Sequence, residues 1–264
     1  MGKRTSYEPG TFCWIELSTT DPDDAKRFYG ELLGWGFEDS EMPGGGTYTM
    51  ARIDGDVVAG ITAQPEQQRS AGVPPNWFSY VAVESADDAA ARASQLGGVA
   101  HAGPFDVGEA GRMAVLGDPT GAMLGAWEPR DAIGAGRVNQ PGCLTWNELG
   151  TSDVPKALSF YEGLFGWTGE VLQMGSGPAY TVIRVGERAN GGIRDLSPEE
   201  EQAGAPPYWF PYLAVESLDG AITRCGELGG AKVFGPIDFP AGRIAALRDA
   251  QGAMFAIWDG VLED

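Results

Sequence analysis

The chain has 264 residues and a formal net charge of −19, because 37 Asp and Glu residues outnumber 18 Lys and Arg residues. That acidity opposes binding to nucleic-acid phosphates or to anionic lipid, so we expect neither nucleic acid nor membrane as a partner. Hydrophobic residues make up 43% of the chain, which is enough to build the cores of one large or two ordinary domains. The three cysteines lack CxxC spacing, and no apolar stretch resembles a signal peptide or a membrane span. These features predict a reduced, cytoplasmic protein.

The chain contains one histidine, His101. Most catalytic zinc, iron and copper sites use two or three imidazole ligands, which this sequence cannot supply. The composition therefore argues against an imidazole-based metal site, and we expect no cofactor. His101 comes just before Gly103-Pro104, and we interpret it as a solvated loop residue.

The start of the chain predicts a strand, a helix and two further strands. Residues 12–19 alternate in hydrophobicity, which is typical of a strand. Asp21-Pro22 supplies an N-cap and a proline for the first helical position, and Gly34 is placed to end the helix. Residues 48–53 and 57–63 then predict two strands around a turn.

A second unit with the same order begins at Trp77. It predicts a strand at 77–83, a helix at 86–96, and a hairpin with strands at 112–116 and 122–127. We interpret each unit as strand, helix and three strands (βαβββ). Two such units make one domain.

The second half of the chain repeats the first. Trp14 and Glu16 recur 132 residues later as Trp146 and Glu148, and phrases such as Phe-Tyr and Pro-Pro-x-Trp-Phe-x-Tyr recur at the same offset. The stretch between the halves is rich in Gly, Ala and Pro and is interpreted as a linker. We therefore expect an N-terminal domain at residues 1–129, a linker at 130–141 and a C-terminal domain at 142–264.

A family resemblance is carried by the helix phrases DPDDAKRFYGELLGW and SDVPKALSFYEGLFGW and by the closing hairpins DPTGAMLGAW and DAQGAMFAIW. With the repeated βαβββ order, they resemble the vicinal oxygen chelate (VOC) superfamily of glyoxalase I, bleomycin-resistance proteins and extradiol dioxygenases. The chain looks most like tandem-domain, glyoxalase-like proteins found near aromatic antibiotic pathways. The resemblance implies an α+β fold with two glyoxalase-like domains, in which two units per domain form a cup-shaped mixed sheet that holds the ligand on its concave side.

Metal-dependent members of that superfamily take ligands from the first and the closing strands of their units. The matching positions in this sequence hold side chains that cannot coordinate a metal: Trp14, Phe78 and Gly125 in the first half, and Trp146, Phe210 and Ala256 in the second. The resemblance therefore implies that both domains have lost the metal site, which argues against lactoylglutathione lyase or extradiol dioxygenase activity. We expect the glycine and alanine to leave room in the cups.

Strand alternation places Trp14 and Glu16 on the face opposite the helix, where the cup would lie. A cup lined by aromatic and methionine side chains suits a flat, aromatic or apolar small molecule, although each lining residue can also be explained as ordinary core. The predicted ligand-binding residues are Trp14, Tyr48, Phe78, Tyr80, Met123, Trp127, Trp146, Tyr180, Phe210, Tyr212, Met254 and Trp258.

Glu16 and its repeat partner Glu148 are the candidate catalytic residues. A carboxylate on an inward strand face is costly to bury, so it is either held by a structural partner such as Arg52, Arg184 or a tyrosine hydroxyl, or kept for a ligand. The two interpretations are evenly balanced. Among indoles, its pKa would rise and allow it to act as a general acid or base.

Two arginines on predicted strands, Arg112 and Arg243, each follow a glycine. Either could bind a ligand carboxylate or carbonyl. A surface position in an acidic protein explains them better.

Three functions remain open. The first is a metal-independent enzyme of specialised, antibiotic or polyketide-type metabolism, with lyase-, isomerase- or oxygenase-like chemistry, in which a cup carboxylate transfers a proton. The second is a non-catalytic protein that sequesters a drug-like molecule and confers resistance. A third, weaker one is a metal-dependent lyase or dioxygenase with carboxylate ligands at unmatched positions. We expect a small aromatic or apolar ligand as partner, and a monomer or a homodimer.

Overall fold

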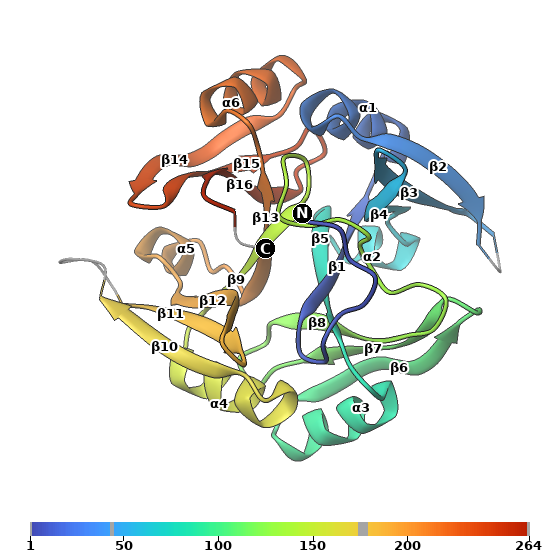
Figure 1. Ribbon diagram of the computed structural model, residues 1–264, viewed down its shortest axis with the longest axis vertical. Helices are drawn as coiled ribbons and strands as arrows, with labels where there is room; N and C mark the ends of the chain where they lie inside the picture. The colour runs from blue at the N-terminus through green and yellow to red at the C-terminus, as the bar shows by residue number, and fades with distance from the viewer. Residues whose placement is uncertain (1, 43–44, 174–178, 263–264) are drawn as a thin grey trace.

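The computed structural model describes residues 2–42, 45–173 and 179–262 of the chain. Figure 1 shows four βαβββ units arranged around a centre where β1, β5, β9 and β13 lie. The first two units form one sheet and the last two form another. The fold is therefore α+β, with two curled mixed sheets, as the sequence predicts.

The elements of the first half follow the predicted order, with their bounds as follows: β1 (Phe12–Thr19), α1 (Pro22–Leu33), β2 (Gly36–Glu41), β3 (Thr47–Ile53), β4 (Asp56–Ala63), α2 (Glu66–Ser70), β5 (Asn76–Ala82), α3 (Ala86–Gln95), β6 (Val99–Val107), β7 (Gly111–Gly117) and β8 (Met123–Pro129). Asp21 caps α1, because its Oδ1 accepts a hydrogen bond from the Asp24 amide at 3.0 Å. Gly34 ends this helix in the left-handed conformation that glycine tolerates best.

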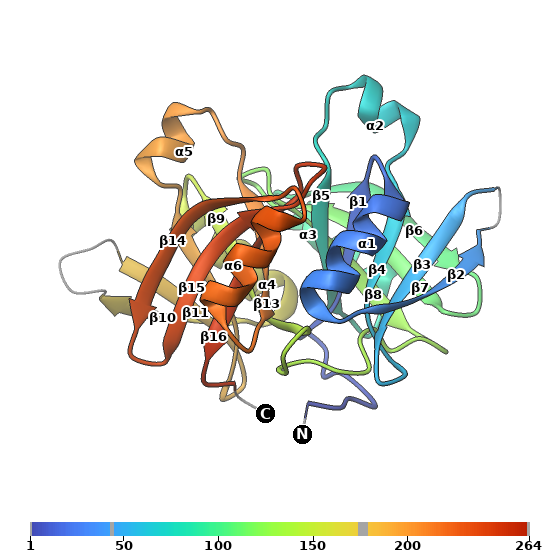
Figure 2. The same cartoon turned by 90° about the horizontal axis from the view of Figure 1, so that it is seen from above.

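The second half repeats this order: β9 (Leu144–Thr151), α4 (Val154–Phe165), β10 (Thr168–Gln173), β11 (Ala179–Val185), β12 (Arg188–Asp195), α5 (Pro198–Gln202), β13 (Tyr208–Ala214), α6 (Leu218–Glu227), β14 (Ala231–Phe239), β15 (Gly242–Arg248) and β16 (Met254–Gly260). The short helices α2 and α5 project from the face opposite the two termini, as Figure 2 shows.

His101 lies on strand β6 rather than in a loop, which corrects the expectation from its position before Gly103-Pro104. The strand escaped prediction because it is at the edge of the sheet and nearly all its residues are exposed. A strand without a buried face shows no alternating hydrophobicity. Strand β2, at the other edge of the same sheet, is also mostly exposed and was not located from the sequence for the same reason.

The sheet order is β2-β3-β4-β1-β5-β8-β7-β6, and the second sheet repeats it as β10-β11-β12-β9-β13-β16-β15-β14. The first strand β1 pairs parallel with β4 and antiparallel with β5. Its residues Ile15 and Leu17 are fully buried in a core that also contains Phe28 of α1. That core face leaves the opposite face of β1 free to carry functional side chains.

The helix-bearing faces of the two halves pack against each other, α1 against α6 and α3 against α4. Tyr29 of the first Phe-Tyr phrase donates a hydrogen bond to Asp249 of the second closing hairpin at 2.9 Å. Tyr161 donates in the same way to Asp118 of the first hairpin at 3.0 Å. The phrases that carried the family resemblance therefore tie the two halves together through the tyrosines of the helices and the aspartates that begin the hairpins.

The segment between β8 and β9 packs back onto the first sheet. Arg137 forms ion pairs with Asp54 at 2.9 Å and with Asp56 at 2.8 Å, and Ala135 is fully buried.

Among the described residues, none of the helices combines the length and apolar character that crossing a bilayer requires.

Candidate functional site

Strand β1 presents Trp14, Glu16 and Ser18 on the face away from the helices, and all three side chains are half-buried. This face of the first sheet is called the N-terminal cup below, and the matching face of the second sheet is called the C-terminal cup. Ser18 Oγ is buried and has no hydrogen-bond partner in the described parts of the chain. The strand therefore brings an aromatic ring, a carboxylate and an unsatisfied hydroxyl to one surface.

Glu16 is held in the N-terminal cup by one hydrogen bond. Tyr48 Oη donates to Glu16 Oε2 at 2.8 Å, and Trp14 Nε1 donates to Tyr48 Oη at 3.1 Å. The other oxygen, Oε1, has no hydrogen-bond partner among the residues that the structure describes. Arg52, a partner that the sequence allowed, pairs instead with Glu38 at 2.8 Å.

Burial raises the pKa of Glu16 above its ordinary value, and the hydrogen bond from Tyr48 offsets part of that rise. The described surroundings of Glu16 contain no cation in contact with it. A carboxyl group with a raised pKa is, once ionised, a stronger proton acceptor than a surface carboxylate. It can therefore accept or donate a proton.

Aromatic side chains surround this carboxylate in the N-terminal cup. Phe78 and Tyr80 lie edge to face, with ring centroids 5.2 Å apart, and both join a cluster with Trp14 and Trp127. Met123, by contrast, is 46% exposed and lies outside this cluster. The structure thus brings together five of the six binding residues predicted for this half, counting Tyr48, and leaves Met123 at the edge.

The room that was expected at Gly125 is filled by a tyrosine, and a second tyrosine covers Gly60 of β4 in the same way. A Cβ at Gly125 would lie 2.1 Å from Cδ1 of Tyr80, and one at Gly60 would lie 2.3 Å from Tyr48 Oη. The two glycines let the tyrosine rings lie against the sheet. The expectation of free space at Gly125 was therefore wrong, because the smaller residue admits a larger neighbour.

The C-terminal cup has the same aromatic residues but a different carboxylate environment. Trp146 Nε1 donates to Tyr180 Oη at 2.9 Å, and Tyr212 Oη donates to Glu148 Oε2 at 2.8 Å. Arg194 Nε lies 2.7 Å from Glu148 Oε1. Glu148 is thus a buried carboxylate in a salt bridge, and both of its oxygens are engaged.

Arg194 belongs to a larger polar network. It also forms an ion pair with Glu200 of α5 at 2.6 Å, and its Nη2 donates a hydrogen bond to the Tyr208 hydroxyl at 3.1 Å. Although burial opposes it, Arg194 and Tyr208 lower the pKa of Glu200 to about 2. This network fixes α5 to the rim of the C-terminal cup.

Arg194 was missed by the sequence reasoning, which named Arg184 as a candidate partner for Glu148. Arg184 instead pairs with Glu170 at 2.7 Å. Strand alternation could have found Arg194, because it lies two residues after Gly192, which is opposite Glu148 in the register of β12 and β9. The first half has Thr62 at the matching place, opposite Ser18.

The other predicted residues of the C-terminal cup fall into the same pattern as in the first half. Phe210 and Tyr212 are buried, with ring centroids 5.8 Å apart, and Trp146 and Trp258 pack against their cluster. Met254 is 37% exposed and lies outside this cluster.

Arg112 and Arg243 lie outside both cups. Arg112 pairs with Asp87 at 2.6 Å and Asp106 at 3.1 Å, and Arg243 pairs with Asp219 at 2.9 Å and Asp238 at 3.1 Å. These are ion pairs of surface residues, as the simpler interpretation expected.

The residues at the superfamily's metal-ligand positions do not fit a metal ion. At these positions the N-terminal cup presents Trp14, Gly60, Phe78 and Gly125. None of these residues has a side-chain atom that can coordinate a metal ion. Tyr48 and Tyr80 also cover the two glycines. Within the described residues, no three His, Cys, Asp or Glu side chains form a group that could hold a metal.

Comparison with known proteins agrees with this architecture. Residues 11–125 match the model of the glyoxalase/bleomycin resistance protein/dioxygenase superfamily. The chain is also 40% identical over 259 residues to the candidate glyoxylase CFP32 of Mycobacterium tuberculosis. The aligned region covers 97% of each chain. This chain belongs to that superfamily.

A second full-length relative is named for a role in anthracycline biosynthesis. The anthracycline biosynthesis protein DauV of Streptomyces sp. strain C5 is 31% identical, and the match covers 96% of this chain and 94% of that protein. This VOC-fold chain therefore has a full-length relative named for specialised metabolism.

Solved structures of the superfamily share the fold. The Mn(II)-bound glyoxalase from Novosphingobium aromaticivorans matches with a TM-score of 0.65 over 100% of this chain and 85% of its own. The two sequences are only 13% identical. The likeness therefore concerns the fold of the tandem domains.

Proposed function

We propose that this chain is an enzyme of specialised metabolism that binds a flat aromatic molecule in its N-terminal cup and transfers a proton with Glu16. The substrate class is an aromatic polyketide with an enolisable C–H that is conjugated with a carbonyl group. Chemistry takes place in the N-terminal cup, and the C-terminal cup has a structural or ligand-holding role.

The difference between Glu16 and Glu148 carries this proposal. Glu148 is neutralised by Arg194 and bound by Tyr212, so it has no free oxygen for a ligand. Glu16 has one hydrogen bond, from Tyr48, and a raised pKa. A carboxylate that served stability alone would gain from a cation such as the one its repeat partner has.

The surrounding rings support an aromatic substrate. Trp14, Phe78 and Trp127 are half-buried, so each leaves part of its ring surface open to a ligand. Flat aromatic molecules pack well on such rings by stacking and edge contacts. The relative DauV is named for anthracycline biosynthesis, and anthracyclines are built from fused aromatic rings.

The proposed step is a proton transfer that needs no oxidant, reductant or second reactant. Deprotonated Glu16 takes the proton from a carbon that is conjugated with the carbonyl, and the electron pair of the C–H bond moves into the ring system to give an enolate. Protonated Glu16 then returns the proton to carbon or oxygen. Tyr48 holds the carboxylate in place during both steps, since its hydroxyl is in turn held by Trp14.

The test uses anthrone, a tricyclic ketone whose C10 methylene is conjugated with the C9 carbonyl through the fused rings and loses a proton to give the enolate. Wild-type protein in D₂O should accelerate hydrogen–deuterium exchange at C10, measured by proton NMR. Glu16→Gln should slow that exchange by about 10²- to 10⁴-fold, the usual contribution of a general base. Glu38→Gln, a surface glutamate paired with Arg52, is the matched control and should leave the rate unchanged.

Binding is measured separately, by tryptophan fluorescence quenching with 1,4-dihydroxyanthraquinone. Binding without exchange would assign the chain to the sequestering proteins and overturn the catalytic proposal. A loss of exchange in Glu148→Gln but not in Glu16→Gln would place the chemistry in the other cup.

A further inference from the structure

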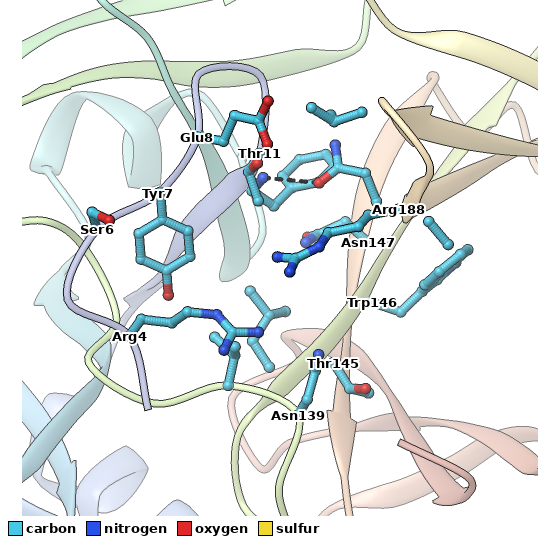
Figure 3. A pocket seen from close by; sticks show the side chains of 16 residues that line it. Arg4, Ser6, Tyr7, Glu8, Thr11, Asn139, Thr145, Trp146, Asn147 and Arg188 are labelled. Carbon is cyan, nitrogen blue, oxygen red and sulfur yellow. Dashed lines mark hydrogen bonds between the residues drawn. The ribbon is translucent and has the colours of Figure 1, made fainter. Parts of the chain in front are cut away.

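A pocket away from the N-terminal cup lies between the N-terminal segment and the second domain, and it shares Trp146 with the C-terminal cup. Its walls come from residues 4–12, from the start of β9 and from the turn between β11 and β12, and its volume is about 210 Å³ (Figure 3). Pockets for drug-sized ligands usually have volumes of roughly 300–1,000 Å³. This pocket therefore suits a molecule smaller than the fused-ring ligand of the N-terminal cup.

Two arginines, Arg4 and Arg188, line this pocket, and Figure 3 shows both guanidinium groups extending into it. Neither forms an ion pair with a described residue; Arg4 donates one hydrogen bond, to the Lys3 carbonyl at 3.3 Å. The chain has twice as many acidic as basic residues, and most of its other arginines are paired with carboxylates. Two unpaired arginines in one pocket make it an attractive place for an anion.

The repeat shows that Arg188 is not required by the fold. Arg188 begins β12, and the residue that begins β4 at the matching position is Asp56. Asp56 is satisfied within the chain, by Arg137 at 2.8 Å and Lys3 at 3.1 Å. The second half therefore has a cation without a described partner where the first half has a completed ion pair.

The rest of the pocket combines a firm polar wall with an apolar one. Asn190 is fixed, because its Oδ1 accepts from the Phe12 amide at 3.2 Å and its Nδ2 donates to the Gly10 carbonyl at 3.0 Å. Trp146 also lines the pocket, and its Nε1 donates to Tyr180 Oη at 2.9 Å on the side of the C-terminal cup. Glu8 also lines the pocket and is its one carboxylate.

We propose that this pocket binds a small aromatic carboxylate, with its carboxylate on Arg4 and Arg188 and its ring against Trp146. A guanidinium group presents a planar pair of donors that matches the two oxygens of a carboxylate. An aromatic ring then gains contact with the indole. The proposal concerns a site other than the N-terminal cup, and it stands independently of the proton transfer by Glu16.

The probe is salicylate, a single-ring carboxylate, and its binding is measured by isothermal titration calorimetry on the full chain. We expect one site per chain, with binding weakened about tenfold or more in Arg188→Met and in Arg4→Met, since each variant removes a charged hydrogen-bond donor. Arg248→Met is the matched control, because Arg248 is an exposed arginine outside the pocket. Glu8→Gln should strengthen binding, since it removes the pocket's like charge.

Three results would overturn the proposal. The first is that salicylate does not bind at millimolar concentration. The second is that Arg188→Met and wild type bind it equally well. The third is that inorganic phosphate binds as tightly as salicylate, which would show a site for anions in general. Binding of 1,4-dihydroxyanthraquinone should be unchanged in Arg188→Met. An unchanged affinity would show that the two sites bind their ligands independently, so that either proposal can fail without the other.

Discussion

Glu16 and Glu148 occupy the same place in the two halves of the chain, but only Glu148 has a cation beside it, with Arg194 Nε 2.7 Å from its Oε1. Thr62 stands where an equivalent arginine would have to be in the first half. A duplicated site has therefore diverged into one neutralised carboxylate and one that is held by a single tyrosine. In the proposed function, this divergence separates a structural role for Glu148 from a chemical role for Glu16.

The ion pair of Glu148 should be important for stability. Arg194→Met leaves a buried carboxylate without its cation, and we expect the free energy of unfolding to fall by about 3 kcal/mol, as for other broken buried pairs. Arg184→Met breaks a more exposed pair and should cost at most about 1 kcal/mol. Urea denaturation of the two variants measures both values. Equal losses would contradict the structural role of the Arg194 network.

Glu16 should make the wild type less stable as pH rises. Because its pKa is raised in the folded state, the folded protein holds this proton more tightly than the unfolded chain does. Stability is then highest below the ordinary glutamate pKa of 4.5 and falls as pH rises from there to the raised folded value. Glu16→Gln should lack this decline, so the variant should gain stability relative to wild type across that window.

Denaturation of both proteins at several pH values measures this difference. Other titrating groups, such as Asp249 with its own raised pKa, are common to both proteins and cancel in the comparison. A constant difference at all pH values would show that the pKa of Glu16 is not raised.

Tyr48 should tune the proton affinity of Glu16. Its hydrogen bond lowers the pKa of that carboxyl, so Tyr48→Phe should raise it further. Since the deprotonated form acts as the base, the acidic limb of the anthrone exchange profile should move to higher pH. Tyr208→Phe, which alters a tyrosine of the Arg194 network, is the control and should leave the profile in place. An unmoved profile in Tyr48→Phe would argue against Glu16 as the base.

Gly125 should resist substitution by alanine. The added Cβ would overlap the Tyr80 ring, so we expect Gly125→Ala to lower the free energy of unfolding by about 1–3 kcal/mol, as overpacking does. Gly226 in α6 has open space around it, and Gly226→Ala should be neutral or stabilising because alanine favours a helix. Thermal unfolding of the pair measures both effects. A neutral Gly125→Ala would mean that Tyr80 moves freely.

Much of the fold could be predicted from repetition and periodicity. The strand at 12–19 and the cap at Asp21 were located because alternation and capping are local properties. The exposed edge strands β2 and β6 were not, because they bury no face and so leave no periodic pattern. His101 was placed in a loop for this reason.

The candidate site was predicted in part. Alternation along β1 placed Trp14 and Glu16 on the correct face, and the repeat drew attention to Tyr48 and Tyr80. Which partner each carboxylate has could not be read from spacing, since Arg194 and Tyr212 reach Glu148 from two other strands. Partners across a sheet depend on strand register and side-chain direction.

The sequence by itself determined the tandem βαβββ architecture and the aromatic character of the cups, because these follow from local pattern and residue chemistry. The resemblance to the superfamily added the positions at which metal-binding side chains are missing. Only the tertiary structure decided that Tyr48 and Tyr80 fill the space over Gly60 and Gly125, that Glu16 and Glu148 differ, and that Arg4 and Arg188 share a pocket. Those facts depend on contacts between segments far apart in the chain. Such contacts arise when the sheets form and the two halves pack together.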